Sequence, residues 1–296
     1  MPVMSIDWID HVVLPVRSLE EASASFERLG LRLTPVTRHQ GLGTENRAIF
    51  VGDGDNDFFI ELLAIHDRAA SLATGRGALY QQAIDEGRGV ARLMLGTGDI
   101  AATADAVRAS GASLTVESVS RDDGVKLCDV APLDNVQGIG ITAGLVQYTQ
   151  ARSESHARRA ADGRFDHTFP LKRLDHLAAM APNLDETTEA WANSLGVGVS
   201  GEVRGTGMII RQLKIGDAVL ELLGPDGPES RLHGRPGGLA SMCAFEVPDI
   251  DAAVALARER GFTCPEANPG VLPGTRVTTI PAAELAGMGL QLLQYV

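Results

Sequence analysis

The sequence has few of the residues that stabilise small secreted proteins or support redox chemistry. Its 296 residues include only three cysteines, Cys128, Cys243 and Cys264, which are widely spaced and form no Cys-x-x-Cys pair. Disulfide frameworks and cysteine-based zinc sites normally need an even set of cysteines or such closely spaced pairs. We therefore predict that all three cysteines are reduced structural residues.

Long apolar runs and an excess of positive charge are also absent. No apolar stretch is long enough to span a bilayer, and the first residues lack the basic and apolar segments of a secretory signal. The net charge is −12, whereas nucleic acids and anionic membranes attract clustered lysine and arginine. The composition predicts a cytoplasmic protein with a small-molecule substrate and no nucleic-acid or membrane partner. A homodimer is compatible with this composition.

One motif occurs twice in the chain. An apolar segment carries His11 directly after an aspartate, and a second one carries His176 in the same setting. Glu61 and Glu221 stand in later apolar segments, at matching points of the repeat. Burying an imidazole and a carboxylate is costly unless they share a proton, a partner or a metal ion. The two His-Glu pairs therefore predict one metal site with four ligands.

The hydrophobic pattern around the first motif predicts a unit of one strand, one helix and three further strands. Residues 8–16 have the β-branched composition of a strand, and 18–29 have helical spacing, with Ser18 as the cap and Gly30 as the stop. Further strands are expected at 31–38, 46–52 and 57–65. Similar units begin near Val90, Leu174 and Ser241, with helices at 99–107, 184–195 and 251–257.

Four such units fill the chain and predict an α+β fold of four βαβββ modules. One unit cannot bury both faces of its sheet, so two units are expected to pair as a half-open curved sheet around a cavity. Residues 1–150 and 171–296 are then two domains of two modules each. The polar, charged segment 151–170 has no apolar periodicity and is predicted to be a linker.

The chain resembles the vicinal oxygen chelate superfamily, which includes glyoxalase I, methylmalonyl-CoA epimerase, extradiol dioxygenases and bleomycin-resistance proteins. The resemblance covers nearly the whole chain and is carried by the repeated motif and by the segments 38–47, 244–253 and 289–293. It implies metal ligands on the first and last strands of a module. These would be His11, Glu61, His176 and Glu221, around a divalent Zn, Ni, Co, Mn or Fe ion. In the second module Arg92 and Gly144 stand at the ligand positions, and in the fourth module Met242 and Gln291 do.

This departure from the superfamily pattern leaves three interpretations. Modules one and three share a cavity and complete a four-ligand site, or His39 joins His11 and Glu61 in a 2-His-1-carboxylate triad. In the third, no functional metal is bound and the His-Glu pairs are hydrogen-bonded around an organic ligand. His39 and Asn46 are candidate substrate contacts. Arg92 would bind a substrate carboxylate or phosphate, or pair with a structural acid.

The resemblance implies a metal-dependent enzyme that transfers a proton through an enediolate, as an isomerase, an epimerase or a glyoxalase-type lyase. Glu61 or Glu221 would be the catalytic base. The first alternative is an extradiol ring-cleaving dioxygenase with ferrous iron. The second is a metal-free binding protein of the resistance type, which the loss of ligands in the even-numbered modules favours.

Overall fold

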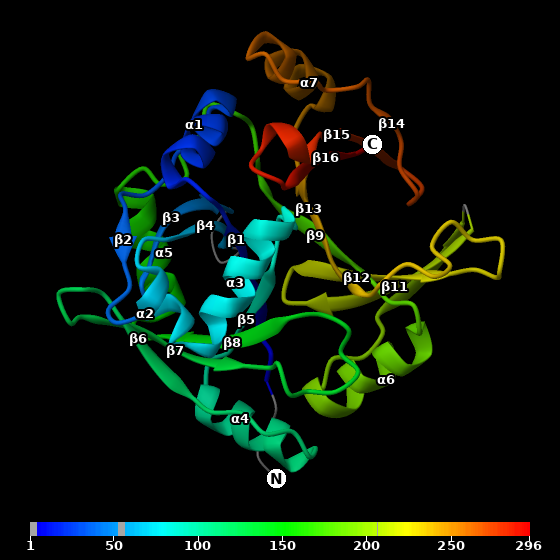
Figure 1. Cartoon of the computed structure of the whole chain (residues 1–296). Helices are drawn as coiled ribbons and strands as arrows, with labels where there is room; N and C mark the ends of the chain where they lie inside the picture. The colour runs from blue at the N-terminus through cyan, green and yellow to red at the C-terminus, as the bar shows by residue number, and fades with distance from the viewer. Residues whose placement is uncertain (1–4, 53–56, 206) are drawn as a thin grey trace.

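Two eight-stranded sheets of the same topology form the framework of the protein (Figure 1). The computed structural model describes residues 5–52, 57–205 and 207–296. The first sheet has the strand order β2-β3-β4-β1-β5-β8-β7-β6 and the second has the order β10-β11-β12-β9-β13-β16-β15-β14. In each sheet two βαβββ modules meet through an antiparallel central pair, β1 with β5 and β9 with β13. The predicted α+β fold of four modules in two curved sheets is confirmed.

The first half contains eight strands and four helices within its described residues. The strands are β1 (Trp8–Pro15), β2 (Thr37–Arg38), β3 (Thr44–Val51), β4 (Phe58–Ile65), β5 (Arg92–Gly96), β6 (Glu117–Ser120), β7 (Lys126–Pro132) and β8 (Ala143–Tyr148). The helices are α1 (Leu19–Leu29), α2 (Arg68–Leu72), α3 (Gly75–Glu86) and α4 (Ile100–Ala109).

The described residues of the second half repeat this order without counterparts of α2 and α3. Its strands are β9 (Arg173–Met180), β10 (Gly201–Gly205), β11 (Met208–Ile215), β12 (Ala218–Pro225), β13 (Gly238–Glu246), β14 (Asn268–Pro269), β15 (Thr275–Ile280) and β16 (Gly289–Tyr295). Its helices are α6 (Leu184–Leu195), α7 (Ile250–Glu259) and the 3-10 turn η1 (Ala282–Glu284). Helix α5 (Arg152–Ala161) joins the halves, so much of the segment predicted to be a linker is helical.

Local sequence signals account for most element boundaries in the first module. The Ser18 side chain accepts a hydrogen bond from the Glu21 backbone N–H, and Gly30 ends α1 with a φ of 93°, which favours glycine. The predicted strand at 31–38 is much shorter in the structure, where only Thr37–Arg38 pairs with β3. Pro35 lies in this segment and has no N–H for a strand ladder, and the buried residues there contribute to the core without forming a strand.

Alternation along the central strands separates a core face from a cavity face. Val12 of β1 and Ile60 of β4 belong to the main hydrophobic core, whereas Val13 and Leu63 line the inside of the first sheet. Because successive strand residues point to opposite sides, Glu61 lies on the inner face with Leu63.

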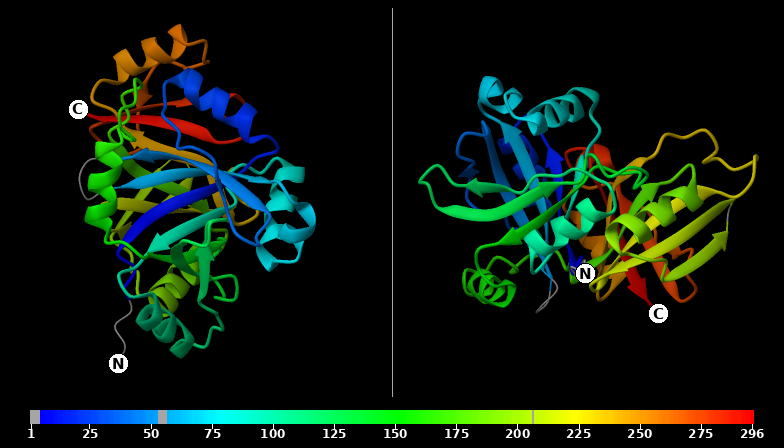
Figure 2. Two further views of the ribbon diagram at one scale, coloured as in Figure 1. Left: turned by 90° about the vertical axis from the view of Figure 1, so that its left-hand side faces the viewer. Right: turned by 90° about the horizontal axis from the view of Figure 1, so that it is seen from below.

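The main core is continuous between the two halves. The rings of Phe58 and Phe245 lie 5.9 Å apart between centroids, and the buried Trp191 indole donates to the Ile139 carbonyl at 2.9 Å. Helices α1 and α7 lie side by side in Figures 1 and 2, with the Arg28 guanidinium of α1 4.2 Å from the centre of the Phe262 ring. The two sheets therefore share one hydrophobic core behind their concave faces.

The two edges of the first curved sheet meet at one point beyond the ends of β2 and β6. His39, just after β2, forms a β-bridge with Arg121, just after β6, and the Gln40 N–H donates to the Ser120 carbonyl at 2.9 Å. No such bridge joins β10 to β14 within the described part of the second half. Helix α5 lies beside β3 in Figure 1, where Arg159 stacks on Phe50 at 4.2 Å. None of the described helices is long and apolar enough to cross a membrane.

Candidate active site

A cavity of about 710 Å³ lies inside the first sheet. Strands of both modules form its wall, and α3 and the end of α5 contribute further lining residues. The size suits a small organic molecule, since ligand pockets typically measure about 300–1,000 Å³. His11, His39, Asn46, Glu61 and Arg92 all line this cavity.

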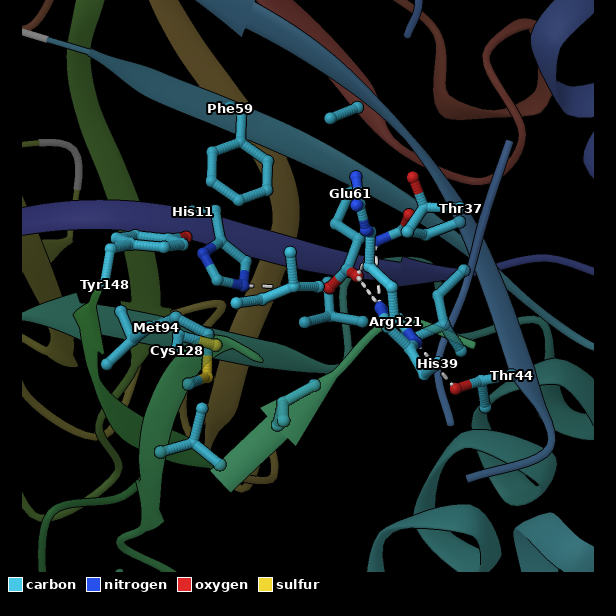
Figure 3. A pocket seen from close by; sticks show the side chains of 18 of the residues that line it. His11, Thr37, His39, Thr44, Phe59, Glu61, Met94, Arg121, Cys128 and Tyr148 are labelled. Atoms are coloured by element: carbon cyan, nitrogen blue, oxygen red, sulfur yellow. Dashed lines mark hydrogen bonds and ion pairs between the residues drawn. The ribbon is translucent and has the colours of Figure 1, made fainter. Parts of the chain in front are cut away.

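Glu61 lies between two imidazoles in the cavity (Figure 3). Its Oε2 atom is 3.7 Å from Nε2 of His11, and its Oε1 atom is 4.0 Å from Nε2 of His39. The Asn46 amide donates a hydrogen bond to Oε1. Oε2 accepts no hydrogen bond from the described residues, so this oxygen is the one available to a bound molecule.

A buried carboxylate fixes the orientation of His11. Nδ1 of His11 lies 2.6 Å from Oδ1 of Asp10, which also accepts from the Tyr148 hydroxyl at 2.8 Å, while Oδ2 accepts from the Trp8 indole. Burial acts to raise the pKa of Asp10, but these hydrogen bonds and the charge of His11 outweigh it, so the pKa is lowered. The ionised Asp10 holds Nδ1–H, and Nε2 of His11 faces Glu61.

His39 is held in the same manner by neutral partners. Its Nδ1 lies 2.9 Å from the Thr44 hydroxyl, and the Asn46 amide donates to its Nε2 at 3.3 Å. Burial lowers the pKa of His39, and the opposing charge of Glu61 offsets only part of this shift. The imidazole is therefore neutral at neutral pH, with its proton on Nδ1 and its lone pair at Nε2.

Arg92 lies deep in the cavity wall and is only 2% exposed. Its Nη2 donates to both carboxylate oxygens of Asp134, at 3.1 and 3.0 Å. Its Nε is buried and has no hydrogen-bond partner among the described residues. Asp134 is thus a structural partner for this guanidinium, and binding of a substrate anion by Arg92 stays a prediction.

In the first half, Tyr148, Asp10, His11 and Glu61 form a chain of polar contacts, which we call the relay. The second half contains a copy of it. The Tyr295 hydroxyl donates to Asp175 at 2.7 Å, Asp175 lies 2.8 Å from Nδ1 of His176, and Nε2 of His176 lies 3.9 Å from Glu221. Burial acts to lower the pKa of His176, but Asp175 and Glu221 outweigh it, so the pKa is raised. Gln212 donates to Glu221 at 3.2 Å.

The two copies differ at the positions of His39 and Asn46. Asn46 lies opposite Leu63, two residues beyond Glu61, and Ile210 holds the corresponding place opposite Leu223. By the same register, Gly205 takes the place of His39. The second half therefore has the Tyr-Asp-His-Glu relay without the second imidazole and without this amide.

The four predicted metal ligands are divided between the two sheets. His11 and Glu61 line the first cavity, whereas His176 and Glu221 pair with each other on the second sheet and do not line it. This separation follows from the pairing of module one with module two and of module three with module four. The structure therefore does not assemble the shared four-ligand site, and it brings together His11, His39 and Glu61 instead.

The chemistry of these three side chains suits a divalent metal ion, but their arrangement does not. In a tetrahedral shell, ligand atoms at about 2.0–2.2 Å from one ion lie about 3.3–3.6 Å from one another. The separations here are 3.7 and 4.0 Å, and the Asn46 amide already bonds both His39 and Glu61. No group of three or more His, Cys, Asp or Glu side chains in the described ranges is placed to hold a metal ion.

Several residues of this site were not predicted from the sequence. Tyr148 supports Asp10 from the last strand of module two, and Phe59 stacks on His11 with ring centroids 4.2 Å apart. Arg158 and Arg164 come from the segment predicted to be a linker. The four arginines among residues 152–164 were a detectable signal, because this charge is unusual in so acidic a chain.

Comparisons of sequence agree with the fold. A glyoxalase-like domain model matches residues 9–163, more than half of the chain, and a model of the glyoxalase, bleomycin-resistance protein and dioxygenase superfamily matches residues 175–279. The chain therefore belongs to the vicinal oxygen chelate superfamily, with glyoxalase-like sequence in both halves. Members of this superfamily commonly use a divalent metal ion. No curated protein matches the sequence.

Solved structures show the same architecture. A hypothetical protein from Staphylococcus aureus has a TM-score of 0.63 at 15% identity, covering 97% of this chain and 98% of that chain. A mutant of 4-hydroxymandelate synthase from Streptomyces coelicolor has a TM-score of 0.65 at 16% identity, covering 100% and 93%. Methylmalonyl-CoA epimerase from Mycobacterium tuberculosis has a TM-score of 0.39 at 22% identity, covering 44% and 91%. The likeness to the first two structures, whose TM-scores exceed 0.5, shows the fold alone.

Proposed function

We propose that the protein is an enzyme that moves a proton at a carbon next to a carbonyl group, as an isomerase, an epimerase or a glyoxalase-type lyase. Glu61 is the base. The observation that carries this proposal is a buried carboxylate with one unbonded oxygen facing a ligand-sized cavity. A carboxylate so placed can accept a proton from a bound molecule without first releasing another hydrogen bond.

The two imidazoles have distinct tasks in this proposal. Asp10 holds the His11 ring with Nε2 facing the cavity, where His11 would contact the oxygen that gains negative charge as the proton leaves carbon. His39 is neutral and acts through Asn46, whose amide holds Oε1 of Glu61. Glu61 would then return the proton to the same or the neighbouring atom.

No step of this proposal is assigned to a metal ion, because the three side chains do not fit one as arranged. The predicted divalent ion is tested by metal analysis of protein purified without an affinity tag. A stoichiometric ion that is lost in His11→Ala and kept in His176→Ala would show that the first cavity rearranges around a metal. Loss of the ion in both variants would favour the shared four-ligand site.

The proposed activity is tested by solvent exchange. Small 2-oxo acids, 2-hydroxyketones and acyl thioesters are incubated with the protein in D₂O, and loss of each C–H signal is followed by proton NMR. Glu61→Gln should reduce exchange by about 10²–10⁴-fold, the usual contribution of a general base. Glu221→Gln is the matched control from the second half and should exchange at the wild-type rate. Full exchange in Glu61→Gln would overturn the assignment of the base.

A dioxygenase is the second candidate, since His11, His39 and Glu61 have the composition of a 2-His-1-carboxylate site. Oxygen consumption with catechols in the presence of ferrous iron, abolished in His39→Ala, would favour it. A metal-free binding protein is the third candidate. Tight ligand binding without exchange or oxygen consumption would favour that function.

A further inference from the structure

Positive charge is concentrated in the cavity of an acidic protein. The whole chain has 38 acidic residues against 26 lysines and arginines. Among the residues that line the cavity, basic residues outnumber acidic ones: there are six arginines and one lysine, but only two acids, Glu61 and Asp162. Apart from the deep Arg92, these cations are Arg76, Arg121, Lys126, Arg158, Arg159 and Arg164.

Most of these cations already have a carboxylate partner. Arg76 pairs with Glu117 at 2.9 Å, and Arg159 pairs with Asp57 at 3.0 Å. Arg158 and Arg164 differ, because neither forms an ion pair with any described residue; Arg158 bonds only the neutral amide of Gln150. Two guanidinium groups at the α5 end of the cavity therefore have no counterion among the residues that the structure describes.

An aromatic path leads from α5, whose Arg159 stacks on Phe50, to the candidate base. The Phe50 and Phe59 rings lie 4.9 Å apart, and Phe59 stacks on His11 at 4.2 Å with an interplanar angle of 20°. His11 in turn faces Glu61. All three rings line the cavity, so an apolar or aromatic body placed against them would have one end at α5 and the other at Glu61.

We infer that Arg158 and Arg164 form a binding site for the anionic head of the substrate, and that the substrate is an organic anion with an aromatic or otherwise apolar body. This inference rests on the proposed function for the identity of the cavity as the active site. Guanidinium groups bind carboxylate, sulfonate and phosphate oxygens through charge-assisted hydrogen bonds. In this orientation the head group at α5 places the far end of the body beside Glu61.

A pair of fluorescent probes tests the site without a known substrate. Anilinonaphthalene sulfonate has an aromatic body and an anionic head, and phenylnaphthylamine has the same body without the sulfonate. Affinities for both probes are measured by fluorescence titration of the full chain. The test variant is Arg158→Gln with Arg164→Gln. The matched control is Arg231→Gln with Arg235→Gln, which removes the same charge from two exposed arginines outside the cavity.

The test variant should lose about tenfold or more in affinity for the sulfonate, since hydrogen bonds to a charged group are removed, and should keep its affinity for the neutral probe. The control variant should bind both probes as the wild type does. An unchanged affinity for the sulfonate in the test variant overturns the inference, and so does an equal loss for both probes.

The Glu61→Gln variant separates this inference from the proposed function. It should bind the sulfonate at least as tightly as the wild type, because it loses only a negative charge. If solvent exchange fails to depend on Glu61 while the probe affinities follow the arginines, the anion site stands and the proton-transfer activity falls. If exchange depends on Glu61 but the probe affinities do not depend on the arginines, the anion site is wrong and the assignment of the base stands.

Discussion

The two tyrosine-aspartate hydrogen bonds provide an internal comparison of equal chemistry in different surroundings. The Tyr148→Phe variant removes a hydroxyl that donates to Asp10 at 2.8 Å, and Tyr295→Phe removes one that donates to Asp175 at 2.7 Å. Asp10 and Asp175 are both 6% exposed, but Tyr148 is half-buried whereas Tyr295 is 50% exposed. Water can therefore replace the lost hydroxyl more readily beside Asp175.

A hydrogen bond to a charged group contributes about 1.5–3 kcal/mol. Asp10 keeps its bonds from His11 and Trp8, so we expect Tyr148→Phe to lower the free energy of unfolding by about 1.5 kcal/mol, the lower end of this range. Tyr295→Phe should cost less than about 0.5 kcal/mol, as is usual for substitutions at exposed positions. Urea unfolding at neutral pH measures both values.

The pH dependence of the cost of Tyr148→Phe gives a second check. Because the pKa of Asp10 is lowered below its ordinary value of 3.8, its stabilising contribution is present above that pH and is lost as the pH falls through the lowered pKa. The cost of Tyr148→Phe should therefore shrink in acid. Equal costs for the two variants at neutral pH, or a cost for Tyr148→Phe that grows in acid, would refute the argument.

Three further outcomes follow from the packing and the titrating groups. Gly89→Ala should lower the free energy of unfolding by more than about 2 kcal/mol, because the added Cβ would lie 1.9 Å from the Ser241 hydroxyl oxygen. Gly87 also has a positive φ but faces open space, so Gly87→Ala should cost about 1 kcal/mol. Urea unfolding measures both values. Because the pKa of His176 is raised, its contribution to folding stability is complete below about pH 6.5 and is lost as the pH rises. The difference in unfolding free energy between the wild type and His176→Gln should therefore decrease from about pH 6 to pH 9. Burial raises the pKa of Cys128 to about 12, so mass spectrometry should find this thiol unmodified by iodoacetamide at about pH 8 until the protein is unfolded.

The sequence was sufficient to predict the fold because the first module has clear local signals, which the other modules repeat in weaker form. Capping residues such as Ser18 and stop residues such as Gly30 define the helices, and the β-branched run in residues 8–16 marks a strand. The strand predicted at 31–38 was too long, because buried leucines give the same apolar pattern whether or not their backbone pairs with a neighbouring strand.

The candidate site was predictable only in part. His11, Glu61, His39 and Asn46 do line one cavity, but the repeated motif gave no information on which modules pair, and so the four-ligand arrangement was inferred across halves that form separate sheets. Tyr148 lies far from Asp10 in the chain, and only the register of β8 in the sheet brings them together.

The presence of both relays in a single polypeptide has a consequence for how each can change. Two identical subunits would carry every substitution in both copies, whereas here Gly205 and Ile210 can stand where the other copy has an imidazole and an amide. One half can therefore acquire a specialised chemistry, while the other half, which does not need the same residues, still contributes to the common core.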